Sequence, residues 1–598
     1  MTDYIAPLSD IRSALDTQGG LDDVLGLPGC EELSGELIDA ILEQAGKFAR
    51  QVLAPLNAPG DRQGCRLVDG AVISPDGFVE AYAGFVAGGW AALTADAQFG
   101  GQGLPRLVGA AVNEIWSSAN MAFALCPLLS QSAILALTQH GSDEQQRLYL
   151  PKLVSGHWTG TMNLTEAQAG SDVGALKTRA RPEGDHYRIK GEKIFITHGD
   201  HDLAENIIHM VLARTPDGPP GVRGISLFLV PKFLVNSDGS LGARNDLRCV
   251  SLERKLGING SPTAMMVYGE DEGAMGWLVG AENQGIECMF TMMNDARIAV
   301  GIEGLAIAER AYQGALAYAR MRIQGRRDGA PAAIIQHPDV RRMLLTMKAR
   351  IAATRGLIYY TAAALDGAER HGDPQRRARC QATVDLLTPV VKAFSTDMGV
   401  EVASLGIQVH GGAGFIEETG AAQHYRDARI APIYEGTNGI QASDLLRRKL
   451  MRDEGAAARA LIADMEALDE PLSRANHGDM AAVRQSLTKG VAALRRATDW
   501  LVETHGSNPD LAAAGATPYL ALFGTVAGGW RMACAGLAAL TDGDEGSARI
   551  TIARRPEEHT SERQSRRNLV CRLLLEKKKS TYMQIKQRLH YSSSHYSI

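Results

Sequence analysis

The feature of this 598-residue chain that most limits its fold is a change of hydrophobic period, from helical to strand-like and back to helical. From Ser34 to about residue 155, apolar residues recur at spacings of three and four, which is typical of amphipathic helices. Strand-like runs follow, separated by turns rich in Gly, Pro, Asp and Asn. These runs are residues 186–197, 206–213, 224–230 and 263–268. After Asn283 the helical spacing returns, and it predicts long helices across 335–370 and 378–406.

We therefore predict an α+β multidomain protein in which a compact β domain lies between helical parts, as a lid or platform. Further helices are predicted across 441–505 and 516–541. The predicted parts are an N-terminal arm with short helices (1–35), an N-terminal helical domain (36–157), the β domain (158–278), a C-terminal helical bundle (279–450) and a helical extension (451–553).

The composition is that of an ordinary globular protein, with 45% apolar and 22% charged residues. A net charge of −6 gives no general reason to expect nucleic acid as a partner. The eight Cys are scattered without a C-x-x-C pair, which argues against a disulfide framework or a metal site and for a reducing compartment. We expect a cytoplasmic protein, because neither a signal peptide nor a run of 18 apolar residues is evident.

The last 45 residues differ from the rest in charge. Residues 554–598 hold 11 Lys and Arg against 4 Asp and Glu, a net of +7. Such a tail on an acidic body would normally indicate an arm that binds nucleic acid or a membrane. However, Glu557–Ser565 and Asn568–Lys579 resemble a translated sequencing adapter with its A-rich read-through. We therefore expect a non-native, disordered tail, which leaves the extension truncated, and exclude it from functional reasoning.

One carboxylate stands out, Glu435, on the turn Ile433–Gln441, where a Gly follows it directly. About twenty residues earlier, the Gly-rich segment Gln408–Phe415 allows a backbone to approach a flat or phosphorylated ligand closely. Two further segments carry small hydroxyls: Thr161–Asp172 and Phe195–Gly199. Backbone amides and hydroxyls suit flavin carbonyls and phosphates, since they donate hydrogen bonds without adding charge. Each segment also has a purely structural interpretation. Residues 171–172 could be a helix N-cap, Phe195 a core aromatic residue, and Glu435 a solvated carboxylate.

Taken together and in this order, the segments resemble the acyl-CoA dehydrogenase family over roughly residues 35–450. The resemblance implies that family's fold, with a barrel-like β domain, and FAD as cofactor. Thr161–Asp172 resembles the flavin-binding signature, with Ala167 where Pro is usual, and Phe195–Gly199 resembles Trp-Ile-Thr-Asn-Gly. The FAD contacts implied in this region come from Met162, Leu164, Thr165, Gly170, Ser171, Phe195, Ile196 and Thr197.

The resemblance also implies contacts to the acyl-CoA. Met293–Arg297 is similar to the family's Leu-Asp-x-x-Arg, with Asn294 where Asp is usual. Asn294 and Arg297 are three residues apart and so share a helix face. The alternative for Arg297 is a solvated surface charge. The substrate contacts implied are Ser171, Asn294, Arg297 and Gly436.

A second group of FAD contacts is implied by Tyr318–Arg326, similar to Tyr-Ala-x-x-Arg-x-x-Phe-Gly, and by the Gly-rich segment. An Arg in this region would bind the pyrophosphate by charge-assisted hydrogen bonds. Since the Gly-rich segment comes from a partner subunit in the family, a homo-oligomer (dimer or tetramer) is implied. The residues are Arg322, Gln324, Gln408, Gly411, Gly412, Thr437 and Asn438. We expect His410 to pack or hydrogen-bond locally rather than to act as an acid or base.

The reaction implied is α,β-dehydrogenation of an acyl-CoA thioester. Glu435 would remove the Cα proton while a hydride leaves Cβ for flavin N5, which gives the trans-2-enoyl-CoA. The base must become more basic when substrate displaces water, and the enolate oxygen needs donors such as the N–H of Glu435.

The length and the opening residues resemble a long bacterial branch that includes enzymes acting on 3-(methylthio)propanoyl-CoA during dimethylsulfoniopropionate breakdown. We therefore expect that substrate, with 3-(methylthio)acryloyl-CoA as product and an electron-transfer flavoprotein as acceptor. The alternatives are a short- or medium-chain fatty acyl-CoA dehydrogenase, a related oxidase, and a DNA-associated flavoprotein of the same fold.

Overall fold

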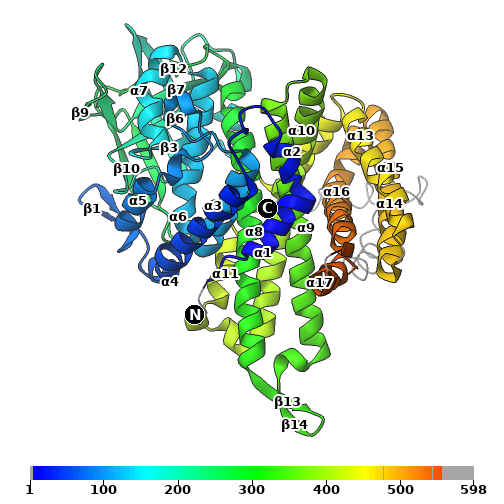
Figure 1. Ribbon diagram of the computed structural model, residues 1–598. Helices are drawn as coiled ribbons and strands as arrows, with labels where there is room; N and C mark the ends of the chain where they lie inside the picture. The colour runs from blue at the N-terminus through cyan, green and yellow to red at the C-terminus, as the bar shows by residue number, and fades with distance from the viewer. Residues whose placement is uncertain (1–3, 476, 542, 555–598) are drawn as a thin grey trace, which may run out of the picture. The chain divides into compact units, whose positions relative to one another are not determined.

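The computed structural model describes residues 4–475, 477–541 and 543–554, so the predicted foreign tail lies outside the described residues apart from Arg554. The chain divides at Asp444 into two compact units. The first unit holds the predicted arm, N-terminal helices, β domain and C-terminal bundle (Figure 1). The second unit holds the helical extension.

The first 154 residues are mainly helical, as predicted. The helix at Gly35 begins where the sequence indicates, because the side chain of Ser34 accepts a hydrogen bond from the N–H of Leu37. A small hairpin, β1 and β2, was not predicted. The elements are α1 (Leu8–Ala14), η1 (Leu15–Gly19), α2 (Leu21–Leu25), α3 (Gly35–Phe48), η2 (Ala49–Leu53), α4 (Ala54–Gln63), β1 (Arg66–Val68), β2 (Ala71–Ile73), α5 (Phe78–Ala87), η3 (Trp90–Ala92), η4 (Ala97–Phe99), α6 (Arg106–His140) and α7 (Asp143–Val154).

Helix α6 consists of two helices joined at a kink. Asn120 has φ −157° and ψ 91°, and its side-chain oxygen accepts a hydrogen bond from the N–H of Phe123, so it caps the second half. In length and hydropathy, α6 and α16 (Pro509–Ala538) could cross a membrane. In α6, 83% of the most apolar window is buried inside the protein, as expected for a core helix, against 56% in α16. The lack of a membrane span stays a prediction.

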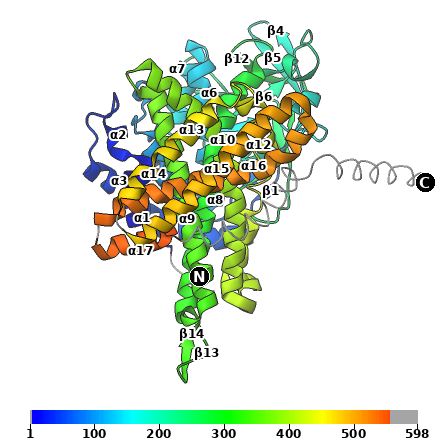
Figure 2. The ribbon, with the colours of Figure 1, turned by 90° about the vertical axis from the view of Figure 1, so that its right-hand side faces the viewer.

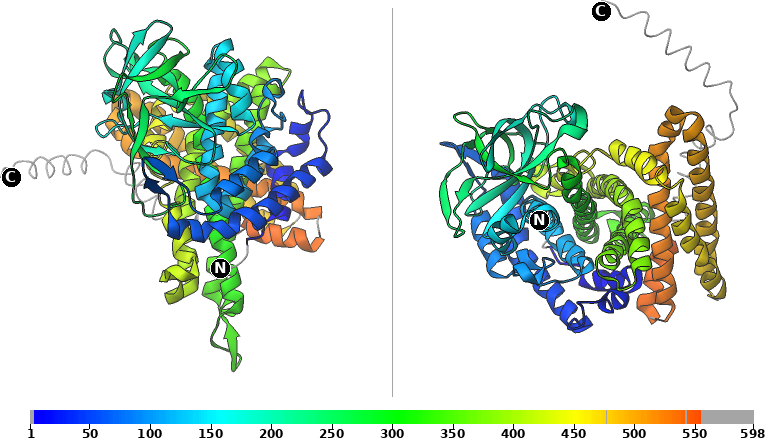
Figure 3. Two further views of the ribbon diagram at one scale, coloured as in Figure 1. Left: turned by 90° about the vertical axis from the view of Figure 1, so that its left-hand side faces the viewer. Right: turned by 90° about the horizontal axis from the view of Figure 1, so that it is seen from above.

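The β domain contains one sheet of eight strands, in the order β10-β11-β5-β12-β7-β6-β3, with β4 paired to β5. The four predicted strands are confirmed as β5, β6, β7 and β11. Strand β3 pairs with β6 in parallel and packs on α6, which joins the sheet to the N-terminal helices (Figure 3). The strands are β3 (Trp158–Asn163), β4 (Arg179–Glu183), β5 (His186–Thr197), β6 (Asn206–Ala213), β7 (Ser226–Pro231), β8 (Phe233–Val235), β9 (Leu241–Arg244), β10 (Leu247–Leu252), β11 (Thr263–Tyr268) and β12 (Ala274–Val279); the 3₁₀ turns are η5 (Val173–Ala175) and η6 (Gly221–Gly224).

Long helices form the rest of the first unit, and α8 and α10 share the most extensive contact. Gly304 makes this approach possible, since a Cβ there would lie 2.4 Å from the carbonyl oxygen of Ser395. Figure 2 shows α8 continuing into the β13–β14 hairpin. The elements are α8 (Gly285–Met321), β13 (Ile323–Arg327), β14 (Ala330–Ala333), η7 (Ile334–Gln336), α9 (Pro338–Arg370), α10 (Pro374–His410), η8 (Gly411–Phe415), η9 (Glu417–Thr419), α11 (Ala421–Ala428) and α12 (Asn438–Asp444).

A buried ionic group ties three of these helices together. Arg355 of α9 donates to the carboxylates of Glu114 on α6, at 2.6 Å, and of Glu309 on α8, at 3.0 Å. The hydroxyl of Tyr359 donates to Glu114 at 2.6 Å. All four side chains are buried. A buried guanidinium with two carboxylates must be fully hydrogen-bonded to be tolerated, so this group fixes how α6, α8 and α9 pack.

The second unit is helical, as predicted for the extension. Its longest helices, α15 and α16, pack together along a row of buried apolar side chains. The elements are η10 (Leu445–Leu450), α13 (Ala456–Ala467), α14 (Asp469–Arg474), α15 (Gly478–Ser507), α16 (Pro509–Ala538), η11 (Ala539–Thr541) and α17 (Gly543–Arg554).

Candidate active site

Glu435 lies on the turn between α11 and α12, in a backbone conformation that is rare for a side chain of its kind. Its φ is +53°, and the φ of Gly436 is +83°. A left-handed conformation costs a non-glycine residue about 1 kcal/mol or more, so the surroundings must hold it. A side chain at position 436 would be strained by the positive φ, and its Cβ would lie 2.9 Å from the amide nitrogen of Gln441, which would have to move.

Three side chains hold this turn through its backbone. The amide of Gln441 donates to the carbonyl oxygens of Glu435 and Gly436, both at 3.1 Å. Lys392 of α10 donates to the carbonyl of Gly436 at 2.8 Å, and Arg297 of α8 donates to that of Glu435 at 3.4 Å. Among the described residues, these hydrogen bonds go to the backbone of the turn, and none of them uses the carboxylate of Glu435.

The charges around Glu435 oppose each other. Burial raises the pKa of its carboxyl above the ordinary value, while the nearby cations Arg297 and Lys392 lower it. Lys392 is itself fully buried, and burial lowers its pKa to about 8. The net result is a carboxylate that is a stronger base than one in water and that still has two cations to stabilise its charge.

Arg297 is 3% exposed, so the alternative of a solvated surface charge is wrong. Its guanidinium lies 3.4 Å from Asp444 and 3.4 Å from the side-chain oxygen of Asn294. The predicted common face of Asn294 and Arg297 is therefore confirmed, and it lies next to Glu435.

The segment of the β domain that resembles a flavin-binding motif has one exposed aromatic ring. Phe195 is 58% exposed with φ +59°, which turns its ring away from the sheet core. Next to it, the carbonyl of Thr197 accepts a hydrogen bond of 2.7 Å from the hydroxyl of Thr161. The side chains of Met162 and Ile196 are buried in the core, so these two residues can offer a ligand little beyond backbone groups.

The loop of the same motif is open. Ser171 is exposed, and no atom lies within 4 Å of a Cβ built at Gly170. Leu164 and Thr165 are half-buried where β3 ends, and the carbonyl of Thr165 accepts from the N–H of Ile194 at 2.9 Å. Asp172 caps the turn η5 by accepting from the N–H of Gly174. The N-cap interpretation therefore holds for Asp172, and it leaves the hydroxyl of Ser171 available.

One loop connects the end of β5 with an apolar cluster at the Glu435 turn. The N–H of His198, which follows Thr197, donates to the carbonyl of Pro262 at 2.8 Å. The same loop carries Ile258, which is buried in a cluster that Tyr434 packs against. The β domain and the helical bundle are thus joined beside the candidate base.

Apart from Thr437 and Asn438, which lie on the Glu435 turn, the second group of predicted FAD contacts lies elsewhere in the chain. Arg322 and Gln324 follow the C-terminal end of α8 and are exposed. Arg322 is roughly 25 residues, or about 37 Å at 1.5 Å per residue, beyond Arg297 along α8. Gln408 is similarly about 24 Å beyond Lys392 along α10. One copy of the chain does not bring these side chains to its own Glu435.

The Gly-rich segment at the end of α10 is exposed at Gln408, Gly411 and Gly412, with no atom within 4 Å of a Cβ built at either glycine. His410 lies with its ring stacked on Tyr318, with ring centroids 4.5 Å apart, and its Nδ1 is 2.7 Å from the carbonyl of Gly406. The predicted local role of His410 is confirmed.

Sequence analysis missed three residues around the base: Lys392, Glu303 and Tyr434. Lys392 interrupts an apolar stretch of α10, and Glu303 interrupts one of α8; a charge on the buried face of a helix was the available signal. The hydroxyl of Tyr434 donates a hydrogen bond to Glu303. Asn438 was predicted, and its side-chain oxygen accepts from Lys392 at 3.0 Å.

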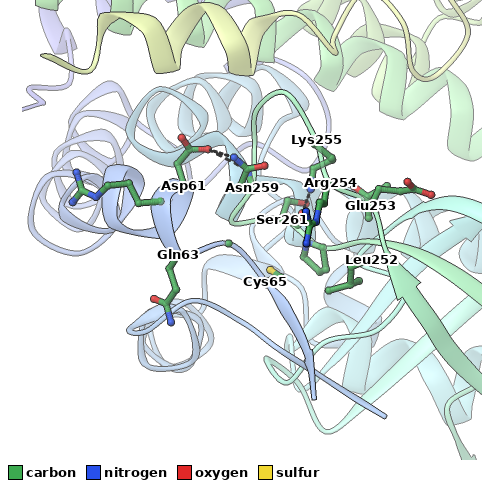
Figure 4. Close-up of a pocket in the computed structure, with 13 residues that line it drawn as sticks. Asp61, Gln63, Cys65, Leu252, Glu253, Arg254, Lys255, Asn259 and Ser261 are labelled. Atoms are coloured by element: carbon green, nitrogen blue, oxygen red, sulfur yellow. Dashed lines mark hydrogen bonds between the residues drawn. The ribbon is translucent and has the colours of Figure 1, made fainter. Parts of the chain in front are cut away.

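A pocket of roughly 230 Å³ lies between the end of α4, the residues just before β1 and the loop before β11 (Figure 4). Asp61 and Asn259 are hydrogen-bonded at its edge, at 2.9 Å. Both Arg254 and Glu253 line it, so its charge is mixed. It contains no predicted site residue, and its lining does not indicate a chemistry.

A second cluster, Cys126, His198 and His201, places three potential metal-ligand atoms within 4.8 Å of one another. Both ring nitrogens of His201 already have partners, since Nδ1 accepts from the N–H of Leu203 and Nε2 lies 3.0 Å from the hydroxyl of Thr159. A metal ion would have to break one of these contacts, so the cluster is better explained as hydrogen-bonded core.

Comparisons with known proteins identify the family of the chain. Four family profiles match in chain order: "Acyl-CoA dehydrogenase, N-terminal domain" over residues 36–157, "Acyl-CoA dehydrogenase, middle domain" over 161–270, "Acyl-CoA dehydrogenase, C-terminal domain" over 283–450, and "Acetyl-CoA dehydrogenase C-terminal like" over 457–554. Fold and matches define an oxidoreductase that acts on acyl-CoA thioesters. The chain belongs to the acyl-CoA dehydrogenase family, whose cofactor is FAD.

The relatives extend over most of the chain. It is 51% identical over 545 residues to 3-methylmercaptopropionyl-CoA dehydrogenase of Ruegeria pomeroyi, covering 90% of this chain and 91% of the relative. A butyryl-CoA dehydrogenase of Syntrophomonas wolfei is 38% identical over 77% of this chain and 78% of its own. The acyl-CoA dehydrogenase of Bacillus anthracis, solved with FAD, shares the fold with a TM-score of 0.74 at 20% identity, over 96% and 94% of the two chains.

Proposed function

We propose that this acyl-CoA dehydrogenase converts 3-(methylthio)propanoyl-CoA to 3-(methylthio)acryloyl-CoA, with Glu435 as base. The observation that carries the role of Glu435 is its position: a half-buried carboxyl of raised pKa, on a turn held by Arg297, Lys392 and Gln441. The proposed substrate is supported by the Ruegeria pomeroyi relative, whose name gives that thioester as its substrate.

In this proposal Glu435 removes the Cα proton of the bound thioester. Displacement of water by the acyl chain raises the basicity of the carboxylate further, because water no longer solvates its charge. Asn294 and Arg297 lie beside it and orient the CoA ester, together with Ser171 and Gly436, while the N–H of Glu435 stabilises the enolate oxygen. When bound, FAD would supply the acceptor for the hydride that leaves Cβ of the acyl group.

The residues of the β domain fit a flavin. The exposed ring of Phe195 offers an aromatic face, and the half-buried Thr197 offers a hydroxyl. The loop at Gly170 and Ser171 is exposed, so its backbone groups and the hydroxyl of Ser171 are accessible to a ligand. We propose the FAD contacts of this region as predicted: Met162, Leu164, Thr165, Gly170, Ser171, Phe195, Ile196 and Thr197.

We further propose that the cofactor site is completed by a second copy of the chain. Arg322 and Gln324, at the end of α8, and Gln408, Gly411 and Gly412, at the end of α10, are exposed and lie far along their helices from Glu435. Phe415, in the same segment, is 84% exposed, which suits a subunit contact. Thr437 and Asn438, next to the base, would contact the diphosphate of FAD.

We propose a cytoplasmic homo-oligomer that passes its electrons to an electron-transfer flavoprotein. The domain limits 36–157, 158–278, 279–450 and 451–553 are proposed with it. A related oxidase would instead produce hydrogen peroxide on turnover in air, which a peroxidase-coupled assay detects. The DNA-associated alternative rests on residues 554–598; salt-sensitive DNA binding by a protein that ends near residue 553 would revive it.

The test is anaerobic bleaching of the yellow holoenzyme by a panel of acyl-CoA thioesters. The proposal requires the methylthio substrate to reduce the flavin with the highest ratio of rate to half-saturating concentration. A higher ratio for butyryl-CoA or a longer fatty acyl-CoA would assign that thioester as the substrate, and the proposed base and cofactor would stand. Absence of bleaching with every thioester would overturn the proposed reaction.

A further inference from the structure

A second carboxyl lies buried under the Glu435 turn. Glu303 is on α8, less than two helical turns beyond Arg297, and is 1% exposed. Its Oε2 accepts a hydrogen bond from the hydroxyl of Tyr434, the residue that precedes the base. Its Oε1 is buried and has no hydrogen-bond partner among the described residues. A buried carboxyl oxygen without a hydrogen bond is rare in folded proteins because it is costly, so a functional role can explain it.

Three titratable groups face Glu303 from the elements packed against α8. Tyr434 and Glu435 come from the turn, and Lys392 comes from α10. Burial raises the pKa of Glu303 to about 8, with Glu435 acting in the same direction and Lys392 against it. This pKa favours the protonated, uncharged form of Glu303 at neutral pH, which avoids a second negative charge beside Glu435.

Glu303 is placed to act on the base rather than on the substrate. It is nearly inaccessible, and its bonded oxygen points to the residue before Glu435. The turn has two consecutive residues in the left-handed region, so its geometry must be imposed by contacts on both sides of Glu435. Arg297, Lys392 and Gln441 supply those contacts at residues 435 and 436. Glu303 supplies one at residue 434.

We propose that Glu303 is a positioning residue for the dehydrogenation, which fixes the Glu435 turn through the hydroxyl of Tyr434. This inference rests on the proposed role of Glu435. As a neutral acid, Glu303 accepts the hydrogen bond without adding a second negative charge beside the base. A carboxylate in its place would raise the pKa of Glu435 further and oppose its ionisation.

The first test compares E303L, E303Q and Y434F by the rate of anaerobic flavin reduction in the holoenzyme. E303L removes the acceptor, and the rate should fall on the order of tenfold. E303Q keeps an uncharged acceptor for the tyrosine, so it should recover most of that loss. Y434F should lose about as much as E303L, and the double variant E303L/Y434F should lose no more than either alone.

The control is E287L, which removes an exposed carboxylate from the first turn of the same helix. FAD content and melting temperature identify variants that fail to fold, and E303Q and Y434F keep the test decisive if E303L is one of them. A loss in E303Q as large as that in E435Q would make Glu303 a second base and overturn the proposal. Additive losses in E303L/Y434F would overturn it equally.

A second readout does not depend on any acyl-CoA. Infrared difference spectra between the wild-type enzyme and E303Q should contain the carbonyl band of a protonated carboxyl, which disappears as the pH rises through about 8. Lys392 titrates in the same range but gives no such band. If no thioester reduces the flavin while this band is present, the proposed reaction fails and the protonation of Glu303 stands. If the band is absent at pH 7, Glu303 is ionised and its proposed role fails.

Discussion

The ammonium group of Lys392 lies 2.8 Å from the carbonyl oxygen of Gly436, the residue directly after the candidate base. Lys392 is fully buried on α10 and lies 44 residues before Gly436 in the sequence. A buried cation that hydrogen-bonds the base turn and lies close to the base couples the geometry of Glu435 to its charge.

Lys392→Met should slow flavin reduction by acyl-CoA on the order of 10-fold to 100-fold, because the turn loses its contact at Gly436 and the base moves. Stopped-flow absorbance measures the rate. Lys190→Met, which removes an exposed lysine from β5, is the matched control and should leave the rate unchanged. An unaffected rate in Lys392→Met would show that Gln441 and Arg297 alone are enough to hold the turn.

Glu435→Gln should keep FAD and still bind acyl-CoA, yet reduce its flavin at least about 100-fold more slowly. The amide is similar in size to the carboxyl and cannot accept the Cα proton. Flavin absorbance under anaerobic conditions measures the rate, and a thermal shift with acyl-CoA measures binding. Normal bleaching in this variant would assign the base to another residue.

The rate of flavin reduction should fall on the acid side at a pH above the ordinary pKa of a carboxyl group. Burial raises the pKa of Glu435, and the base must be ionised, so the rate falls as the pH decreases through that raised pKa. In Lys392→Met this fall in rate should move to higher pH, because a cation that lowers the pKa is gone. A fall that stays at the same pH in the variant would mean that Lys392 acts on geometry alone.

Gly436→Ala should reduce activity about tenfold or more, since the new Cβ would lie 2.9 Å from Gln441 at a φ of +83°. The turn must then shift, and Glu435 shifts with it. Gly372→Ala is the control, because no atom lies within 4 Å of a Cβ built there. Crystal structures of both variants would show whether the change is confined to residues 434–438.

Arg355→Met should destabilise the first unit by about 3–5 kcal/mol, because Glu114 and Glu309 stay buried without their cation. Thermal unfolding of the FAD-loaded enzyme measures the effect. Arg342→Met, on the same helix, breaks only a half-exposed pair with Asp339 and should have little effect. Equal melting temperatures for the two variants would show that the buried group is replaceable by apolar packing.

Hydrophobic spacing was enough to predict most of the fold. The strands at 186–197, 206–213 and 263–268 have the predicted limits, because each is bounded by turn residues that cannot continue it. The β1–β2 hairpin was missed, since its strands are only three residues long and too short to show a period.

The site residues that belong to a sequence motif were predictable. Those that only tertiary packing brings to the site were not. Glu435 and Arg297 belong to segments with recognisable spacing. Lys392 and Glu303 lie within helical patterns, and only the packing of α8 against α10 brings them to the turn. The FAD contacts remain predictions, because each rests on resemblance to the family rather than on a contact within this chain.

The length of α8 bears on how inactive variants of this enzyme would behave when mixed. In the proposed assembly, each active centre draws Glu435 from one polypeptide and Arg322 from another. Two defective proteins, one altered at each position, would form a hybrid in which one centre inherits both defects and the other inherits neither. Co-expression of the pair would therefore restore activity that neither parent has.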